Sequence, residues 1–232
     1  MPHVRPVVLD TSVVLPATLS PRGYRRRFWV LLAFGALAAR SNLARLEAEA
    51  LRREASAAGS ESGGLPVDAL AAQTDARYRR LNELLPPGCP DDWRLVGSRP
   101  LLEEYVRKLR EAGPKLDQAL RPNGIEVVRR QIESVCADMT EDFDPTKIPR
   151  YTADRNDDPI VHTALLADAT WLIADDRKHI STDPHGITEY ELPGSERRVS
   201  AVTFSRFLEH LTDIDLDHVD PGLLAAAFGP LT

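Results

Sequence analysis

Two short apolar segments that each end at an aspartate constrain the fold of this chain more than any other feature. Residues 6–9 are a proline and three aliphatic residues followed by Asp10, and the apolar residues 169–174 are followed by Asp175 and Asp176. Runs of this length that stop at a charge predict buried strands, and residues 198–202 form another short strand. Because helical patterns separate these strands, we expect a parallel sheet with crossover helices on both faces, which is an α/β fold.

Helical periodicity covers much of the remaining chain. Apolar side chains recur at helical spacing over five segments, namely residues 24–36, 42–55, 68–85, 101–112 and 125–136. Asn156 to Pro159 combines acidic caps with a proline in the first turn, which indicates a helix start, and Thr203 caps a last helix. Since the strands lie near the two chain ends, we expect one domain over residues 1–232, with residues 57–150 as a helical elaboration or insertion.

Composition excludes several classes of protein. Lys and Arg number 29 and Asp and Glu number 35, so the formal net charge is −6 and a strongly basic nucleic-acid coat is absent. No apolar run approaches the roughly 20 residues that span a bilayer. The first apolar run is too short for a secretory signal, because it ends at Asp10. Cys89 and Cys136 are too few for a disulfide scaffold or a four-cysteine zinc site. We therefore expect a cytoplasmic protein without a membrane partner.

Carboxylates occur where the predicted strands end and where a predicted helix begins. In an open parallel sheet, the carboxyl ends of the strands form the ligand crevice, so Asp10, Asp157 and Asp176 should converge there. Clustered carboxylates repel one another and are costly to desolvate, and a hard divalent cation relieves both effects. Oxygen ligands favour Mg²⁺ or Mn²⁺, which can activate water and stabilise a phosphate undergoing hydrolysis.

These segments resemble the PIN domain, a family of metal-dependent nucleases that includes the ribonuclease toxins of bacterial toxin–antitoxin modules. The resemblance rests on residues 7–12, on residues 156–164 leading to residues 171–176, and on residues 199–211, which are similar to the last strand and helix of the family. It covers the two ends of the chain and not the middle. It implies a PIN-like parallel sheet flanked by helices and a Mg²⁺- or Mn²⁺-dependent endoribonuclease that hydrolyses RNA. An antitoxin protein and a homodimer are the partners that it implies.

The resemblance assigns the metal-binding acids one position at a time. Asp10 matches the first acid of the family, Asp157 the third and Asp176 the fourth, while Thr11 and Ser12 match hydroxyls beside the first. These acids would hold one or two ions through direct or water-mediated contacts. Where the family often has a Thr or Ser two positions before the last acid, this chain has Ala174. That departure puts catalytic efficiency in question but leaves the carboxylate cluster.

The second acid of the family lies on a helix that follows the second strand after a small polar residue. Ser41 provides such a start here, so the resemblance favours Glu47, with Glu49 as a rival. The two side chains point about 200° apart on a helix, so only one can face the site. Glu47 borders the predicted buried face of Leu43, Leu46 and Ala50, and Glu47 is therefore the predicted fourth member of the catalytic and metal-binding set.

Basic and imidazole side chains offer contacts to RNA. Four arginines follow the Asp10 turn and would place positive charge beside the acidic pocket, although charged helix faces are usually only solvated; they are Arg22, Arg25, Arg26 and Arg27. His179 lies three residues after Asp176, where it could contact a phosphate or simply occupy a loop.

Two other functions compete with the nuclease hypothesis. One is a PIN-like module that binds RNA or protein but cleaves poorly, which Ala174 and the uncertain second acid favour. The other is a phosphotransfer enzyme that uses Asp10 as a nucleophile. Phosphatases of that kind typically carry a second aspartate two positions later, where this chain has Ser12.

Overall fold

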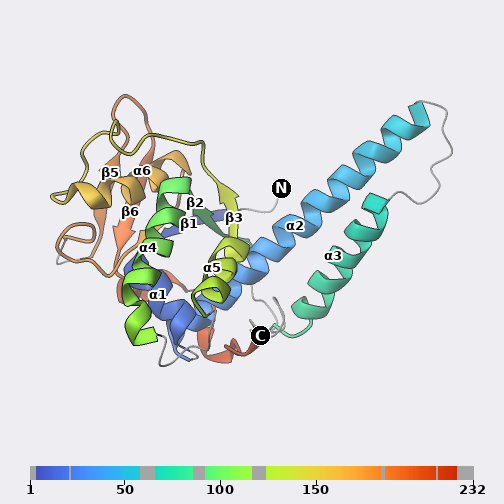
Figure 1. Ribbon diagram of the computed structural model, residues 1–232, viewed down its shortest axis with the longest axis horizontal. Helices are drawn as coiled ribbons and strands as arrows, with labels where there is room; N and C mark the ends of the chain where they lie inside the picture. Colours follow the sequence, from blue (N-terminus) through green and yellow to red (C-terminus); the bar gives the residue numbers. More distant parts are fainter. Residues whose placement is uncertain are drawn as a thin grey trace.

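A six-stranded, mostly parallel sheet organises the part of the chain that the computed structural model describes, which is residues 4–20, 22–57, 66–85, 92–116, 124–183, 186–212 and 214–223 (Figure 1). The strands are β1 (Arg5–Leu9), β2 (Trp93–Gly97), β3 (Cys136–Met139), β4 (Trp171–Ile173), β5 (Thr188–Glu191) and β6 (Arg198–Val202). They lie in the order β3-β2-β1-β4-β6-β5, and only β5 runs antiparallel to its neighbour. The predicted α/β class is confirmed.

Helices connect and cover these strands. They are α1 (Thr11–Leu19), α2 (Tyr24–Ala57), α3 (Pro66–Asn82), α4 (Arg99–Leu116), α5 (Gly124–Val135), α6 (Asp158–Leu166) and α7 (Phe204–His210), with two 3₁₀ turns, η1 (Arg155–Asp157) and η2 (Leu216–His218). The predicted cap of α7 is present, because the Thr203 side chain accepts a hydrogen bond from the Arg206 backbone N–H. Pro159 lies in the first turn of α6 as predicted, but the Asp157 side chain at the N-cap of that helix makes no capping hydrogen bond. No helix in the described ranges combines the length and apolarity needed to cross a membrane.

The middle of the chain contributes to the sheet itself, so the expected helical insertion over residues 57–150 is corrected. β2 pairs in parallel with β1 and with β3, and both β2 and β3 come from this middle segment. Trp93 at the start of β2 packs edge-on against Phe28 of α2 and Phe207 of α7, with ring centroids 5.5 and 5.6 Å apart. Backbone pairing and burial stabilise these strands in spite of their weak local pattern, which includes Arg94 and Gly97.

The helix α2 is continuous over 34 residues, whereas the sequence pattern predicts two helices. Its first half packs on the sheet, and Gly35 lies so close to β2 that an added Cβ would be 1.8 Å from the Trp93 carbonyl oxygen. Its second half extends away from the sheet and packs against α3 (Figure 1). We call this hairpin, residues 41–57 with α3, the arm.

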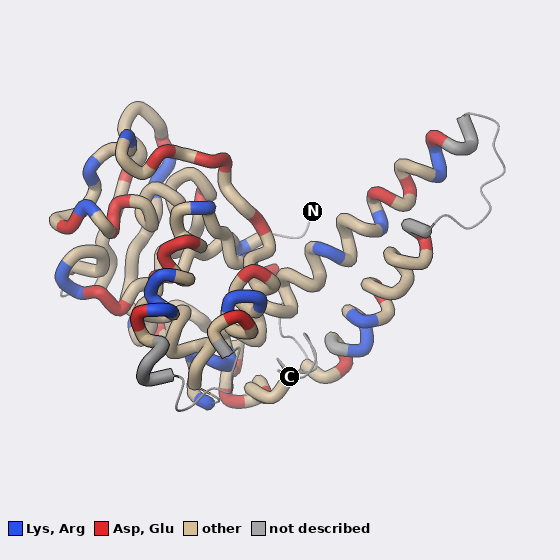
Figure 2. The backbone as a smooth tube through the Cα atoms, in the orientation of Figure 1, with Lys and Arg blue, Asp and Glu red and all other residues tan. Residues whose placement is uncertain are grey.

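The buried face of the arm differs from the predicted one. Leu43 and Leu46 are each 57% exposed, whereas Ser41 and Ala48 are buried. Small side chains let two helices approach closely, and the Ser41 hydroxyl donates to Asp75 of α3 at 3.4 Å. Acidic and basic residues are present along both helices of the arm (Figure 2). The arm therefore buries Ser41 and Ala48 and exposes Leu43, Leu46 and Ala50 of the predicted buried face.

Candidate metal centre

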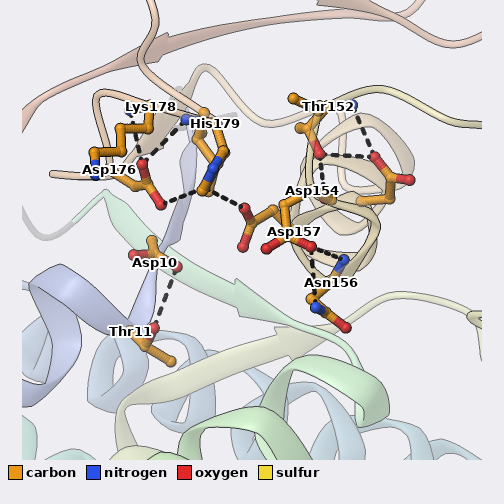
Figure 3. Close-up of polar contacts among 12 residues, drawn as sticks. Asp10, Thr11, Thr152, Asp154, Asn156, Asp157, Asp176, Lys178 and His179 are labelled. Carbon is orange, nitrogen blue, oxygen red and sulfur yellow. Dashed lines mark hydrogen bonds and ion pairs between the residues drawn. The ribbon is translucent and has the colours of Figure 1, made fainter.

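A cleft of about 1230 Å³ opens where β1 and β4 end, and acidic side chains from several elements line it. Parallel neighbours β1 and β4 bring Asp10 and Asp176 to the same edge of the sheet, and η1 adds Asp157. Figure 3 shows the three carboxylates facing a common space. The acidic lining consists of Asp10, Glu103, Glu104, Asp154, Asp157 and Asp176. Three of the four predicted acids thus lie together.

Asp10 is held at the start of α1, a helix that the sequence pattern did not indicate beyond a turn. Its carboxylate accepts a hydrogen bond from the Ser12 backbone N–H at 2.8 Å and from the Thr11 hydroxyl at 3.3 Å. The Ser12 hydroxyl oxygen in turn accepts from the Asp175 backbone N–H at 3.0 Å. This contact joins the end of β1 to the end of β4, so it fixes Asp10 and Asp176 relative to each other.

Asp157 is an acid of the cleft whose pKa is raised by its surroundings. Burial, and then the negative charges of Asp154, Asp176 and Asp10, raise the pKa of Asp157 from 3.8 to about 6, while His179 opposes the rise. Its buried Oδ2 accepts no hydrogen bond from any described residue, although His179 Nδ1 lies 3.3 Å away. Burial and the neighbouring negative charges therefore disfavour the charged form of Asp157.

The neighbouring Asp158 has a structural role. It is fully buried, and its Oδ1 accepts from the backbone N–H groups of Tyr151 and Thr152 at 2.9 and 2.8 Å. The Thr152 hydroxyl donates to the same oxygen at 3.0 Å. Asp158 thereby holds the loop that precedes η1 in place. This loop leads into Asp154, the N-cap of η1, and into Asp157, its last residue, and both line the cleft.

Asp176 sits in a turn that supplies its own hydrogen-bond donors (Figure 3). Its Oδ1 accepts from the backbone N–H groups of Lys178 and His179 at 2.8 and 3.1 Å, and its Oδ2 lies 3.2 Å from His179 Nδ1. Burial acts to raise the pKa of Asp176, but the hydrogen bonds and the imidazole together lower it. Asp176 is therefore kept charged beside an Asp157 whose pKa is raised.

Glu47 does not join these acids, and its prediction as a site residue is corrected. It is exposed on the arm and is absent from the cleft, as is Glu49, which lies 3.9 Å from Arg53. The helix that follows the second strand is α4, not residues 42–55, and it starts after Ser98. Glu103 and Glu104 on α4 line the cleft instead.

The signal for this acidic pair was present in the sequence. Residues 101–112 are recognisably helical, and a small polar residue, Ser98, precedes them. The sequence pattern does not indicate the strand at Trp93–Gly97, so it does not identify the helix after that strand as the one whose acids line the cleft. Glu104 is held by Arg107, whose Nη2 lies 2.6 Å from its carboxylate.

Two further residues complete a group that sequence reasoning did not assemble. Asp154, Asp157 and His179 each offer a ligand atom, and these atoms all lie within 4.8 Å of one another. Asp154 accepts hydrogen bonds from the backbone and side-chain amide nitrogens of Asn156, both at 3.0 Å. Asp154 could have been suspected because a spacing of three residues places it beside Asp157 in a 3₁₀ turn.

The arginines that follow α1 are mostly used inside the protein. Arg25 forms an ion pair with Asp175 and lies 5.2 Å from the centre of the Phe204 ring. Arg26 is buried against the carbonyl oxygens at the end of α1, and Arg27 donates to the Leu216 carbonyl at 2.7 Å. These three side chains make contacts within the protein beside the cleft, and their contact with RNA stays a prediction.

Comparisons of the chain with profiles of protein families, with curated proteins and with solved structures give no match. The residues of the cleft must therefore be tested on their own chemistry. Their donors are mainly carboxylate oxygens, which suit a hard divalent cation. The buried Oδ2 of Asp157, which accepts no hydrogen bond from a described residue, is an acceptor that such a cation would satisfy. The donor set fits Mg²⁺ or Mn²⁺.

Proposed function

We propose that this protein is a PIN-like endoribonuclease that depends on Mg²⁺ or Mn²⁺. The observation that carries the proposal is the meeting of Asp10, Asp157 and Asp176, from three distant segments, in one cleft at the carboxyl edge of a parallel sheet. These residues would hold the cation, with Glu104 in the position first assigned to Glu47. A bound divalent cation supplies charge neutralisation at the scissile phosphate and an activated water.

The protein contributes a fixed arrangement of acids. Hydrogen bonds to Asp10 and Asp176 come from backbone N–H groups within two or three residues, so neither carboxylate needs to reorganise when the cleft is filled. Asp175 supports the same turn, because its carboxylate accepts from the Phe204 backbone N–H at 3.0 Å and pairs with Arg25. Hydrolysis by water at such a site needs no covalent bond to the protein.

Basic side chains also line the cleft, where Arg107 pairs with Glu104 and Glu111, and Lys108 with Glu111. Arg107 and Lys108 of α4 and Arg155 of η1 belong to its lining. Nearby, Lys178 is exposed, and no carboxylate pairs with its ammonium among the described residues. Phosphate contacts of this kind weaken as salt rises, so RNA binding should fall with ionic strength. The choice of RNA as substrate follows from the resemblance to the PIN family. The basic side chains of Arg155 at the cleft and of Lys178 near it support a phosphodiester substrate.

Cleavage of single-stranded RNA in the presence of Mn²⁺ tests the proposal. The wild-type protein should cleave, Asp10→Asn should not, and both should fold alike. Asp215→Asn is the matched control, because Asp215 also caps a short helical turn through its carboxylate but lies outside the cleft. Equal cleavage by wild type and Asp10→Asn would overturn the assignment.

A PIN-like module that binds RNA without efficient cleavage is the second candidate. It is favoured by Ala174, which leaves the end of β4 without a hydroxyl, and by the ion pair that engages Glu104 with Arg107. Calorimetric titration with Mn²⁺ separates the two functions. RNA binding without any heat of metal binding would favour the module over the nuclease.

A further inference from the structure

His179 holds a ring nitrogen between two of the cleft carboxylates. Its Nδ1 lies 3.3 Å from Oδ2 of Asp157 and 3.2 Å from Oδ2 of Asp176 (Figure 3). These aspartates belong to segments that are distant in sequence, so the imidazole bridges the two sides of the cleft. A further acid, Asp154, offers an oxygen within 4.8 Å of the ligand atoms of both Asp157 and His179.

The position of the imidazole is fixed by its backbone. The His179 backbone N–H donates to Asp176 at 3.1 Å, and the Tyr190 hydroxyl holds the next residue by donating to the Ile180 carbonyl oxygen at 2.8 Å. The His179 side chain is only 34% exposed. The backbone on both sides of the His179 side chain is therefore held by hydrogen bonds, unlike that of a solvated loop histidine.

Oδ2 of Asp157 gives a second reason to place a cation at this point. This oxygen is buried and accepts no hydrogen bond within the described ranges, because the geometry of its contact with His179 is that of an ion pair only. An ion held jointly by Oδ2 and the ring nitrogen would satisfy both atoms. This oxygen, which accepts no hydrogen bond from a described residue, thus borders the same space as the imidazole.

We infer that His179 is a nitrogen ligand of this centre and that the centre selects a first-row transition ion, represented by Mn²⁺, over Mg²⁺. Mg²⁺ binds oxygen donors and keeps much of its hydration shell, whereas an imidazole favours first-row transition ions. The remaining donors are carboxylates, which suit Mn²⁺. This inference rests on the proposed function only in its premise that the cleft binds a divalent cation.

Pulsed electron paramagnetic resonance on the full chain loaded with Mn²⁺ tests the ligand directly. We expect nitrogen modulation from a directly bound imidazole in the wild-type protein and its loss in His179→Asn. His218→Asn is the matched control, because His218 Nδ1 lies 2.8 Å from Asp215, also three residues away, but outside the cleft. The wild-type spectrum alone can refute the inference, so the test does not depend on the folding of a variant.

Calorimetric titrations with Mn²⁺ and with Mg²⁺ test the selectivity. His179→Asn should weaken Mn²⁺ binding by about tenfold or more while changing Mg²⁺ binding much less. Bound Mn²⁺ without nitrogen modulation, or equal changes for both ions, would overturn the role of His179 and leave a carboxylate site intact. Absence of binding by either ion would overturn the proposed function as well, so the two failures are distinguishable.

Discussion

Replacing Asp157 by asparagine should make the metal-free protein more stable near neutral pH. Burial and the neighbouring carboxylates raise the pKa of Asp157 from 3.8 to about 6. Ionising this carboxyl group near neutral pH therefore costs more free energy in the folded chain than in the unfolded chain. A difference of about two pH units, at about 1.4 kcal/mol per unit, sets an upper limit of about 3 kcal/mol. The side chain is 23% exposed, and solvent screening reduces the expected gain to about 1–2 kcal/mol.

The pH dependence of this gain follows from the direction of the shift. Because the folded protein binds this proton more tightly than the unfolded chain does, wild-type stability falls as pH rises from about 4 to about 6. The penalty is then constant at higher pH. Asp157→Asn removes it, so its advantage should be full at about pH 7.5 and absent at about pH 4.

Urea unfolding in the presence of a chelator measures both points. Asp144→Asn provides a control of opposite sign, because the hydroxyl and backbone N–H of Thr146, and then Lys147, lower the pKa of Asp144 to about 2. That variant should lose stability at neutral pH, and the loss should disappear as pH falls below about 4 and then through about 2. A variant Asp157→Asn that is no more stable than wild type at neutral pH, or equally stabilised at about pH 4, would refute the reasoning.

Other substitutions test the fold and the reassigned acid. Gly35→Ala should lower the free energy of unfolding by about 2–3 kcal/mol, because the new Cβ would lie 1.8 Å from a carbonyl oxygen of β2. Leu46→Ser on the exposed face of the arm should change that free energy by less than about 0.5 kcal/mol. Chemical denaturation measures both variants, and an unchanged stability of Gly35→Ala would contradict the close approach of α2 to β2. Glu104→Gln should weaken Mn²⁺ binding by about tenfold while Glu47→Gln leaves it unchanged, as measured by calorimetry. A loss of affinity in Glu47→Gln alone would restore the original assignment.

Features that depend on neighbouring residues could be predicted from the sequence. Strand β1 and Asp10 are adjacent in the chain, as are β4 and Asp176, so a local pattern of apolar residues followed by an acid was enough to locate both. The start of α6 at Pro159 and the Thr203 cap of α7 were predictable for the same reason, since these signals act within three residues. Knowing that parallel strands align their carboxyl ends then placed Asp10, Asp157 and Asp176 on one edge of the sheet.

The acidic side chains that α4 contributes to the cleft were missed because their identification depends on recognising a strand. β2 carries Arg94 and Gly97, so its local pattern is weak, and it is stabilised by pairing with β1 and β3 and by burial of Trp93. The same applies to the arm, in which Leu43 looks core-facing by periodicity. Its actual partner, α3, packs on Ser41 and Ala48 instead, because small residues permit closer helix contact.

By itself, the sequence therefore determined the α/β class and the acids that end its first and fourth strands, because hydrophobic periodicity and capping act over a few residues. Tertiary structure alone decided that Glu104 rather than Glu47 lines the cleft and that His179 bridges Asp157 and Asp176. Those outcomes depend on which distant segments pack together, and that choice is made by burial and backbone pairing summed over the whole fold.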